Sequence, residues 1–320
     1  MAAIVQTNTV SRADADGRDS GSSGSRRRLS ETATHAALAI VALSSLFFMM
    51  GIILVLFQQA MPAVMALGPT ELVYGKEWYP ADDPPTFGAL PLLSASAVVT
   101  VGAMAVAVPL GLLSALCISQ ILPTRVRSIV KPAVELLAGL PSVVYGLFGM
   151  GLVAPLTMRM FRLPTGLTAF TASIVLGIMA LPTVASVAED AFSAVPRTCK
   201  EASLALGATT WETISRVLLP AAAPGVVAAV LLGIGRAMGE TMAVLMVAGG
   251  AAVIPLSPFQ PVRPITATIA AEMGETPVGS LHYHALFALA AMLFIITAAF
   301  NLVAEALARR LRRQTGGDAG

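Results

Sequence analysis

Residues 201–220, EASLALGATTWETISRVLLP, carry the most informative pattern in the chain. The small and apolar residues at its start predict a short helix, which Gly207 can end because glycine adopts a left-handed conformation without steric cost. A second amphipathic helix is expected to follow and to end at Pro220. Leu204 and Leu206 would leave a shallow apolar surface on the first helix. Such a helix could dock into a groove of a partner protein or lie on a membrane surface.

The rest of the chain has the composition of a membrane protein. Of its 320 residues 56% are hydrophobic and 12% charged, about half the charge of a soluble domain. A membrane helix needs roughly 20 apolar residues, and six stretches qualify. They are 36–57, 92–118, 133–158, 167–188, 222–247 and 284–307. The sequence therefore predicts an all-α, polytopic membrane domain over 35–310, with a cytoplasmic coupling-helix loop at about 189–221.

The two ends of the chain are predicted to be cytoplasmic tails. Residues 1–34 are rich in Ser, Gly, Asp and Arg, which predicts disorder, and 311–320 form a second short tail. The apolar run that follows the first tail is too long for the core of a signal peptide. With both ends inside, 15 of the 20 Lys and Arg residues lie on the cytoplasmic side and 4 outside, as the positive-inside rule requires.

The spacing within 201–220 resembles the EAA loop of ABC importer permeases. That loop reads Glu-Ala-Ala, three residues, Gly, nine residues, Ile-x-Leu-Pro. The matching residues here are Glu201, Ala202, Ser203 (for the second Ala), Gly207, Val217 (for Ile), Leu219 and Pro220. The resemblance implies a coupling helix that sits in a cleft of a separate ATPase. No phosphate-cradling Gly-x-x-x-x-Gly-Lys-Ser/Thr loop occurs in the sequence. ATP and Mg are therefore expected on that partner, with no enzyme activity and no cofactor in this chain.

The fifth predicted span contains two charges, Arg236 and Glu240, followed by Thr241. Charges inside a membrane helix are costly and mark functional or packing sites. Four residues apart, the two could share a helix face and pair. Gly235 and Gly239 are predicted to let another helix approach closely. Two interpretations stay open: the charges neutralise each other and join helices, or Arg236, Glu240 and Thr241 line the path of an oxyanion.

Longer stretches resemble the PstC-type permeases of phosphate importers. They are FGALP (87–91), LAGLPSVVYG (137–146), LPT (181–183) and, most specifically, GRAMGETMAV (235–244). Residues 94–96 depart from that pattern. The resemblance implies inorganic phosphate as the substrate and the bacterial inner membrane, with its lipid, as the location. It also implies a sister permease subunit, an ATPase dimer and an external phosphate-binding protein as partners. Nucleic acid is not expected.

Three other functions compete with this interpretation. A permease for another oxyanion, such as molybdate or sulfate, is the nearest. A carboxylate, however, can accept a hydrogen bond from a protonated phosphate, whereas sulfate carries no proton at neutral pH and would gain nothing from it. A proton-coupled secondary transporter could use Glu240 as a relay, although the coupling loop argues against it. An integral-membrane enzyme would need a nucleophile–base pair or a metal motif. His282, His284, Cys117 and Cys199 have no metal-ligand spacing, so no metal site is predicted.

Overall fold

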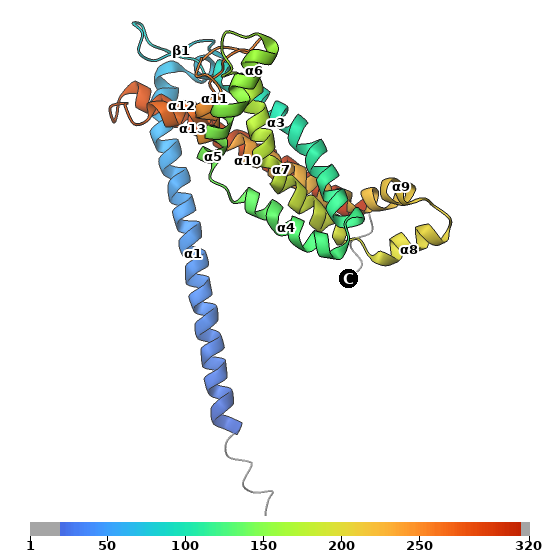
Figure 1. The fold of residues 1–320 in the computed structure, drawn as a ribbon. Helices are drawn as coiled ribbons and strands as arrows, with labels where there is room; N and C mark the ends of the chain where they lie inside the picture. Colours follow the sequence, from blue (N-terminus) through green and yellow to red (C-terminus); the bar gives the residue numbers. More distant parts are fainter. Residues whose placement is uncertain (1–19, 315–320) are drawn as a thin grey trace, which may run out of the picture. The chain divides into compact units, whose positions relative to one another are not determined.

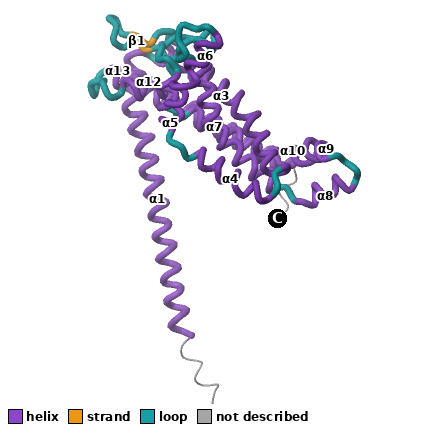
Figure 2. Tube along the Cα trace, viewed as in Figure 1, coloured by secondary structure: helices purple, strands orange, loops and turns teal. Residues whose placement is uncertain are grey.

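The computed structural model describes residues 20–314, which are mainly helical (Figures 1 and 2). Six helical segments in this range are long and apolar enough to cross a membrane. They are Ala37–Leu67, Leu90–Ile121, Ser142–Phe161, Ala169–Ser193, Thr210–Met238 and Leu281–Arg310. The predicted all-α class with six membrane helices is therefore confirmed.

The chain divides into two units, one up to Val55 and one from Leu56, and the packing described below belongs to the second. The elements are α1 (Ser20–Leu67), α2 (Pro69–Tyr74), β1 (Trp78–Tyr79), β2 (Thr86–Phe87), α3 (Leu90–Leu116), η1 (Cys117–Ile121), α4 (Thr124–Ala138), α5 (Ser142–Phe148), η2 (Gly149–Val153), α6 (Ala154–Phe161), α7 (Ala169–Ser193), α8 (Arg197–Ala205), α9 (Thr210–Thr213), η3 (Ile214–Leu218), α10 (Leu219–Met238), α11 (Met242–Val247), α12 (Ile265–Glu272) and α13 (Leu281–Gln314). The three η elements are π-helical, and β1 pairs antiparallel with β2.

Helix α7 is the centre of the bundle and is buried over a larger share of its apolar stretch than any other span. It packs against α3 and α10. Small residues make this packing possible. No hydrophobic force acts between helices in a membrane, so the attraction comes from close contact between backbones, which small residues permit. A Cβ added to Gly177 would lie 2.8 Å from Cβ of Val106 and 3.0 Å from the carbonyl oxygen of Ala103. Glycine at 177 is therefore what lets α7 cross α3 so closely.

The loops, the β hairpin and α12 gather at one end of the bundle, away from α8 and α9 (Figure 2). Here Trp78 is only 1% exposed and packs edge-on against Phe87 in a core that includes Leu72, Ile265 and Leu286. Trp78 is thus a core residue of these loops.

The third predicted span, 133–158, was placed too early in the chain. Residues up to Ala138 form the separate amphipathic helix α4, and the span itself is Ser142–Phe161. The break falls at Gly139-Leu140-Pro141, where proline disfavours a helical conformation in the residue before it. Glu135 therefore lies in α4, outside the third span.

The fifth predicted span, 222–247, is also shifted. The helical run begins at Thr210, so the second helix of the coupling loop continues into the membrane, and α10 ends at Met238. Pro220 does not end a helix as predicted. It lies in the first turn of α10, directly after the π-helical segment Ile214–Leu218. A proline is tolerated where the regular hydrogen-bond ladder is already interrupted.

The predicted disordered tail, 1–34, differs in part from the structure. Helix α1 begins at Ser20, and once a helix is nucleated each added residue costs little. Residues 1–19 lie outside the described residues. At the other end α13 continues to Gln314, into the predicted tail 311–320, whose remaining residues are also outside the description.

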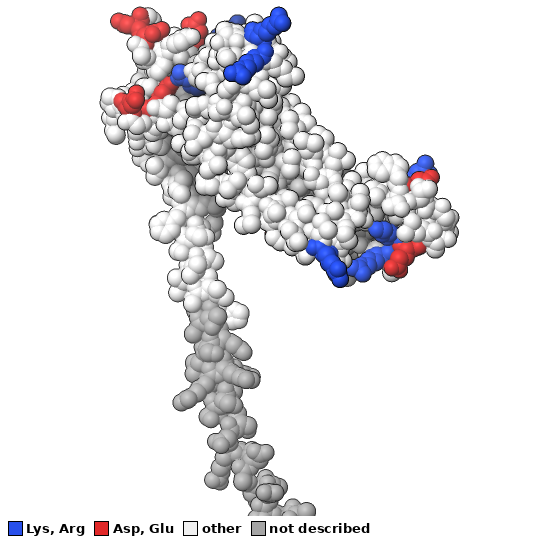
Figure 3. Space-filling model, viewed as in Figure 1, with Lys and Arg blue, Asp and Glu red and all other residues white. Residues whose placement is uncertain are grey.

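Charged side chains gather at the two ends of the second unit, with a wide uncharged band between them on the face drawn in Figure 3. One charged region covers α4 and α8, and the other covers the hairpin and loops. This distribution suits a bundle whose middle lies in hydrocarbon.

Candidate coupling loop and substrate path

Helix α8 of the predicted coupling loop ends as the sequence predicts. Gly207 has φ +86°, the left-handed conformation. The N–H of Gly207 donates to the carbonyl of Leu204 (3.0 Å), and that of Ala208 donates to the carbonyl of Ser203 (3.2 Å). These bonds satisfy carbonyls that the helix end leaves free. An unstrained glycine therefore sets the direction in which the chain leaves α8.

A second local motif starts α9. The Thr209 hydroxyl accepts from the Glu212 N–H, and the Glu212 carboxylate accepts from the Thr209 N–H (2.9 Å), which is a complete capping box. The hydroxyls of Ser203 and Thr213 hydrogen-bond at 3.0 Å and join α8 to the end of α9. The loop is thus held together largely by its own residues.

Part of the surface of this loop is apolar. Leu206 is 90% exposed, and Leu204 and Trp211 are exposed as well. The sequence predicted the two leucines but missed Trp211 of α9, although an aromatic residue in a loop is itself a signal of a docking surface. The other residues that match the EAA pattern are also on the surface. Those exposed are Glu201, Ala202, Gly207, Leu219 and Pro220, while Ser203 is half-buried.

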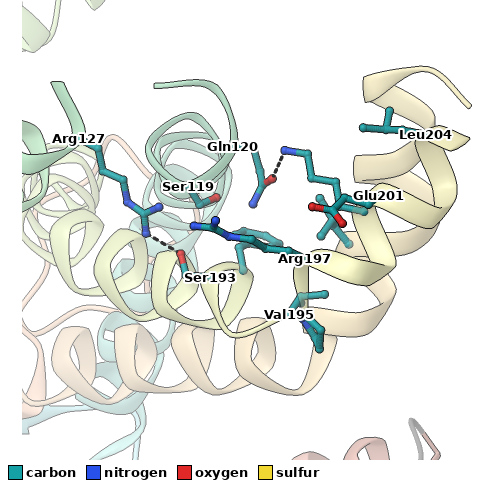
Figure 4. A pocket seen from close by; sticks show the side chains of 12 residues that line it. Ser119, Gln120, Arg127, Ser193, Val195, Arg197, Glu201 and Leu204 are labelled. Carbon is teal, nitrogen blue, oxygen red and sulfur yellow. Dashed lines mark hydrogen bonds between the residues drawn. The ribbon is translucent and has the colours of Figure 1, made fainter. Parts of the chain in front are cut away.

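A cavity of about 380 Å³ lies between α8 and the ends of η1 and α7 (Figure 4). Lys200 Nζ donates to Gln120 Oε1 (3.0 Å) across it and ties α8 to η1. Arg127, from α4, donates to the Ser193 hydroxyl (2.7 Å) at its other edge. A polar side chain therefore connects α8 to η1, while Arg127 joins α4 to the end of α7 at the other edge of the same cavity.

Next to this cavity a carboxylate that the sequence analysis missed is almost completely buried. Glu189, in α7, is 1% exposed. It forms ion pairs with Arg127 and with Lys131 Nζ (2.6 Å), and it accepts a hydrogen bond from Ser193 (2.7 Å). Lys131 also donates to Asp190 (2.7 Å). Hydrogen bonds to Asp190 and then to Glu189 raise the pKa of Lys131 above its usual range. We call Glu189, Arg127, Lys131 and Ser193 the Glu189 cluster.

The charged pair of the fifth span is arranged differently from the prediction. Helix α10 ends at Met238, so Arg236 lies on the helix and Glu240 lies in the break that follows. Arg236 Nη2 donates to the carbonyl of Ala138 at the end of α4 (3.0 Å). Within residues 20–314 Arg236 and Glu240 form no ion pair. The prediction of a pair on one helix face is wrong, because the helix does not continue to Glu240.

Glu240 instead organises the break. Its Oε1 accepts the backbone N–H of Ala243 (3.0 Å) and so caps α11, and its carbonyl accepts from the Thr266 hydroxyl (2.7 Å). Thr241, at the N-terminal boundary of α11, is half-buried. The structure therefore brings Arg236, Glu240 and Thr241 to one helix break and joins that break to α4 and α12.

The two glycines predicted to pack against another helix, Gly235 and Gly239, do not lie at a close helix crossing within the described residues. A Cβ added to Gly235 would meet nothing within 4 Å, and one at Gly239 would meet only the Gly235 carbonyl. The close crossings of α10 with α7 are at Gly225, where an added Cβ would lie 2.4 Å from Cβ of Ala191, and at Gly233, where it would lie 2.6 Å from Val184. Within the described chain no helix packs on Gly235, so its role in helix packing stays a prediction.

Comparison with known proteins agrees with this arrangement. Residues 107–315 match the family described as binding-protein-dependent transport system inner membrane component. The chain belongs to this family. It is thus a transport component of a membrane, not a catalytic enzyme. The matched range includes the coupling loop, the Glu189 cluster and the break at 239–241.

Several relatives are similar over most of their length. The phosphate transport system permease protein PstC of Mesorhizobium japonicum is 34% identical over 91% of this chain and 94% of its own. The probable ABC transporter permease YqgH of Bacillus subtilis is 38% identical over 77% of this chain and 80% of its own.

Among solved structures, a bacterial alginate ABC transporter has a TM-score of 0.63 at 14% identity, covering 89% of this chain and 97% of its own. The MetNI methionine ABC transporter has a TM-score of 0.52 at 21% identity, covering 70% and 94%. These likenesses show a shared fold.

At the opposite end of the permease a second polar cluster escaped prediction. Glu272 of α12 accepts from Trp78 Nε1 (3.1 Å), forms an ion pair with Arg263 (2.7 Å) and hydrogen-bonds to His282 Nε2 (2.9 Å). It therefore holds the β1–β2 hairpin to α12 and α13. No group of three His, Cys, Asp or Glu that could hold a metal occurs among the described side chains.

Proposed function

We propose that this chain is the permease subunit through which an ATP-driven importer moves inorganic phosphate, and that Arg236 contacts the passing anion. The similarity to PstC of M. japonicum, over nearly the full length of both chains, supports phosphate as the substrate. The main observation in support of this site is that the Arg236 guanidinium has a buried donor with no hydrogen-bond partner among the described residues.

Arg236 has hydrogen-bond donors to spare. One Nη donates to the Ala138 carbonyl, while Nε is buried and has no partner within the described residues. A buried donor without a partner is costly, and the guanidinium is planar and suited to two-point contact with an oxyanion. Arg236 is therefore the natural contact for phosphate at the end of α10.

Glu240 provides selectivity for a protonated anion in this proposal. Its Oε1 is used by the Ala243 N–H, which leaves Oε2 without a partner in the described part of the chain. That oxygen can accept a hydrogen bond from the proton that phosphate carries at neutral pH. Sulfate has no such proton and would be repelled by the carboxylate. Thr241, adjacent in the break, would supply a hydroxyl to the same path.

The partners follow from the exposed surfaces. An ATPase dimer that binds ATP and Mg would take the apolar surface of Leu204, Leu206 and Trp211 into its cleft. A sister permease subunit would cover the exposed face of α10 at Gly235, and a phosphate-binding protein would dock on the outer loops. We place the chain in the bacterial inner membrane with both termini in the cytoplasm.

Orientation can be tested by labelling single cysteines in a background without Cys117 and Cys199. Asp82 and Arg125 are both exposed, one in the outer loop and one on α4. Asp82→Cys should react with an impermeant maleimide added to intact cells, and Arg125→Cys should react only after lysis. The reverse result would invert the topology.

The substrate assignment can be tested with the complete importer in vesicles, by measuring uptake of labelled phosphate against competing sulfate and molybdate. Arg236→Lys keeps the charge but loses the planar fork, so uptake should fall about tenfold. Arg125→Lys is the matched control and should transport normally. Glu240→Gln should weaken the discrimination against sulfate. Equal competition by sulfate or molybdate in the parent protein would overturn phosphate as the substrate.

A further inference from the structure

Helix α4 is held at both ends by the two sites described above. In its first half Arg127 and Lys131, one turn apart on the helix, pair with Glu189. At its end the Leu137 carbonyl accepts from the Tyr145 hydroxyl (2.8 Å), and the Ala138 carbonyl accepts from Arg236 (3.0 Å). A single helix thus connects the Glu189 cluster to the guanidinium proposed to contact phosphate.

The Glu189 cluster is in turn next to the coupling helix. Glu189 and Ser193 lie in the last turns of α7, which ends at Ser193, and α8 begins at Arg197. Arg127 also lines the cavity that Lys200 and Glu201 of α8 line from the other side. A movement of α8 relative to the bundle therefore reaches the residues that hold α4.

Helix α4 is also suited to move. None of its residues is buried, in contrast to α7, so few apolar contacts hold it in place. Its position depends on the polar contacts at its two ends. Buried ion pairs are weak evidence for stability, because the desolvation of the charges offsets much of their attraction. The Glu189 carboxylate is 1% exposed and lies against α4, so it calls for a role other than stabilising the fold.

The C-terminal end of α4 presents partial negative charge to Arg236, as an anion would. The free carbonyls at a helix C-terminus carry partial negative charge and attract cations. While α4 stays in this position, the Ala138 carbonyl occupies one donor edge of the guanidinium, and a phosphate would have to displace it. Contact with α4 and contact with phosphate are therefore alternatives for that edge.

We propose that α4 is the link through which the coupling loop controls Arg236, with Glu189, Arg127 and Lys131 as its positioning residues. With the Glu189 cluster intact, movement of α8 displaces α4 and frees Arg236 for the anion. The part concerning the anion rests on the proposed function, whereas the movement of α4 does not.

The movement can be measured directly in the full importer. Leu136 on α4 and Leu232 on α10 are exposed and can carry spin labels as cysteines, in a background without Cys117 and Cys199. In the parent protein the distance between the labels should change when ATP binds. Lys131→Met should abolish most of this change, and so should Glu189→Gln. Lys131→Met is the safer variant, because Glu189 keeps Arg127 and Ser193 as partners. Arg125→Met, which removes an exposed cation from the same helix, should leave the change intact.

Uptake provides the second measurement. Lys131→Met should lower phosphate uptake about tenfold relative to Arg125→Met, the size of a typical coupling free energy, while the ATPase still copurifies. A label distance that does not respond to ATP in the parent would overturn the link, and so would an unchanged response in both Lys131→Met and Glu189→Gln. If the link holds but sulfate competes equally with phosphate, only the proposed substrate fails.

Discussion

The coupling loop and the break in the fifth span both interrupt helices, but they satisfy their polar groups in different ways. In the loop most stabilising bonds are local: Gly207 to Leu204, Ala208 to Ser203, and the reciprocal bonds of Thr209 and Glu212, with Lys200 to Gln120 as the bond to a distant residue. In the break the important bonds come from far along the chain, from Arg236 to Ala138 and from Thr266 to Glu240. The loop is therefore self-supporting, whereas the break exists only inside the folded bundle.

The largest effect should come from exchanging the two charges of the break, Arg236→Glu with Glu240→Arg. If the residues were partners, the exchange would preserve their pair and their function. Because Arg236 binds the end of α4 and Glu240 caps α11, the exchange should leave both groups without partners. We expect phosphate uptake to fall at least about 30-fold, corresponding to ~2 kcal/mol for a lost charged hydrogen bond.

That measurement needs matched membrane expression and a bound ATPase. Near-normal uptake by the exchanged protein would show that the two charges serve only each other. It would contradict the substrate path and the α4 contact together.

The next largest effect should follow from Gly207→Val in the coupling loop. A β-branched residue at φ +86° is strained, and such strain costs about 1–3 kcal/mol. Since the loop is exposed, we expect the membrane bundle to keep its thermal stability while ATPase copurification and uptake both fall. Gly207→Asn is the control, because asparagine tolerates the left-handed conformation. Equal losses in both variants would mean that the size of the side chain at position 207, and not its backbone conformation, causes the effect.

A third comparison uses two glycines of α10. Gly233→Ala should destabilise the subunit by about 1–3 kcal/mol, because the added methyl would lie 2.6 Å from Val184. Gly235→Ala should leave the isolated subunit unchanged, since nothing lies within 4 Å. Thermal melting in detergent tests both. If Gly235→Ala lowers recovery of the sister subunit without changing the melting temperature, position 235 faces that partner.

The smallest effect should be Thr209→Ala, which removes the side-chain half of the capping box. A lost N-cap costs about 1 kcal/mol, and it should appear as faster amide hydrogen exchange confined to α9. Thr210→Ala, at the neighbouring exposed position, is the control. Exchange that also accelerates at the 239–241 break would show that the two regions are less independent than their bonding indicates.

The same difference between local and distant contacts explains which features the sequence predicted correctly. The presence of six spans, the end of α8 at Gly207 and the exposed leucines were predicted correctly, because apolar length and local turn chemistry decide them, whereas the bounds of the third and fifth spans were shifted. The predicted pairing of Arg236 with Glu240 was wrong, since helix periodicity does not show that hydrogen bonds from Thr266 and Ala243 stabilise a break. Glu189 was missed because it stands at the end of a predicted span, where a carboxylate is ordinarily solvated.

The sequence by itself thus determined the membrane class, the approximate positions of its helices and the coupling loop, all of which depend on interactions between near neighbours. The tertiary structure alone decided which charges meet. It placed Arg127 and Lys131 against Glu189, set the end of α4 against Arg236, and used Gly233 for a tight crossing. The physical reason is that a buried charge takes the partner that packing brings within reach, and packing joins residues that are distant in the chain.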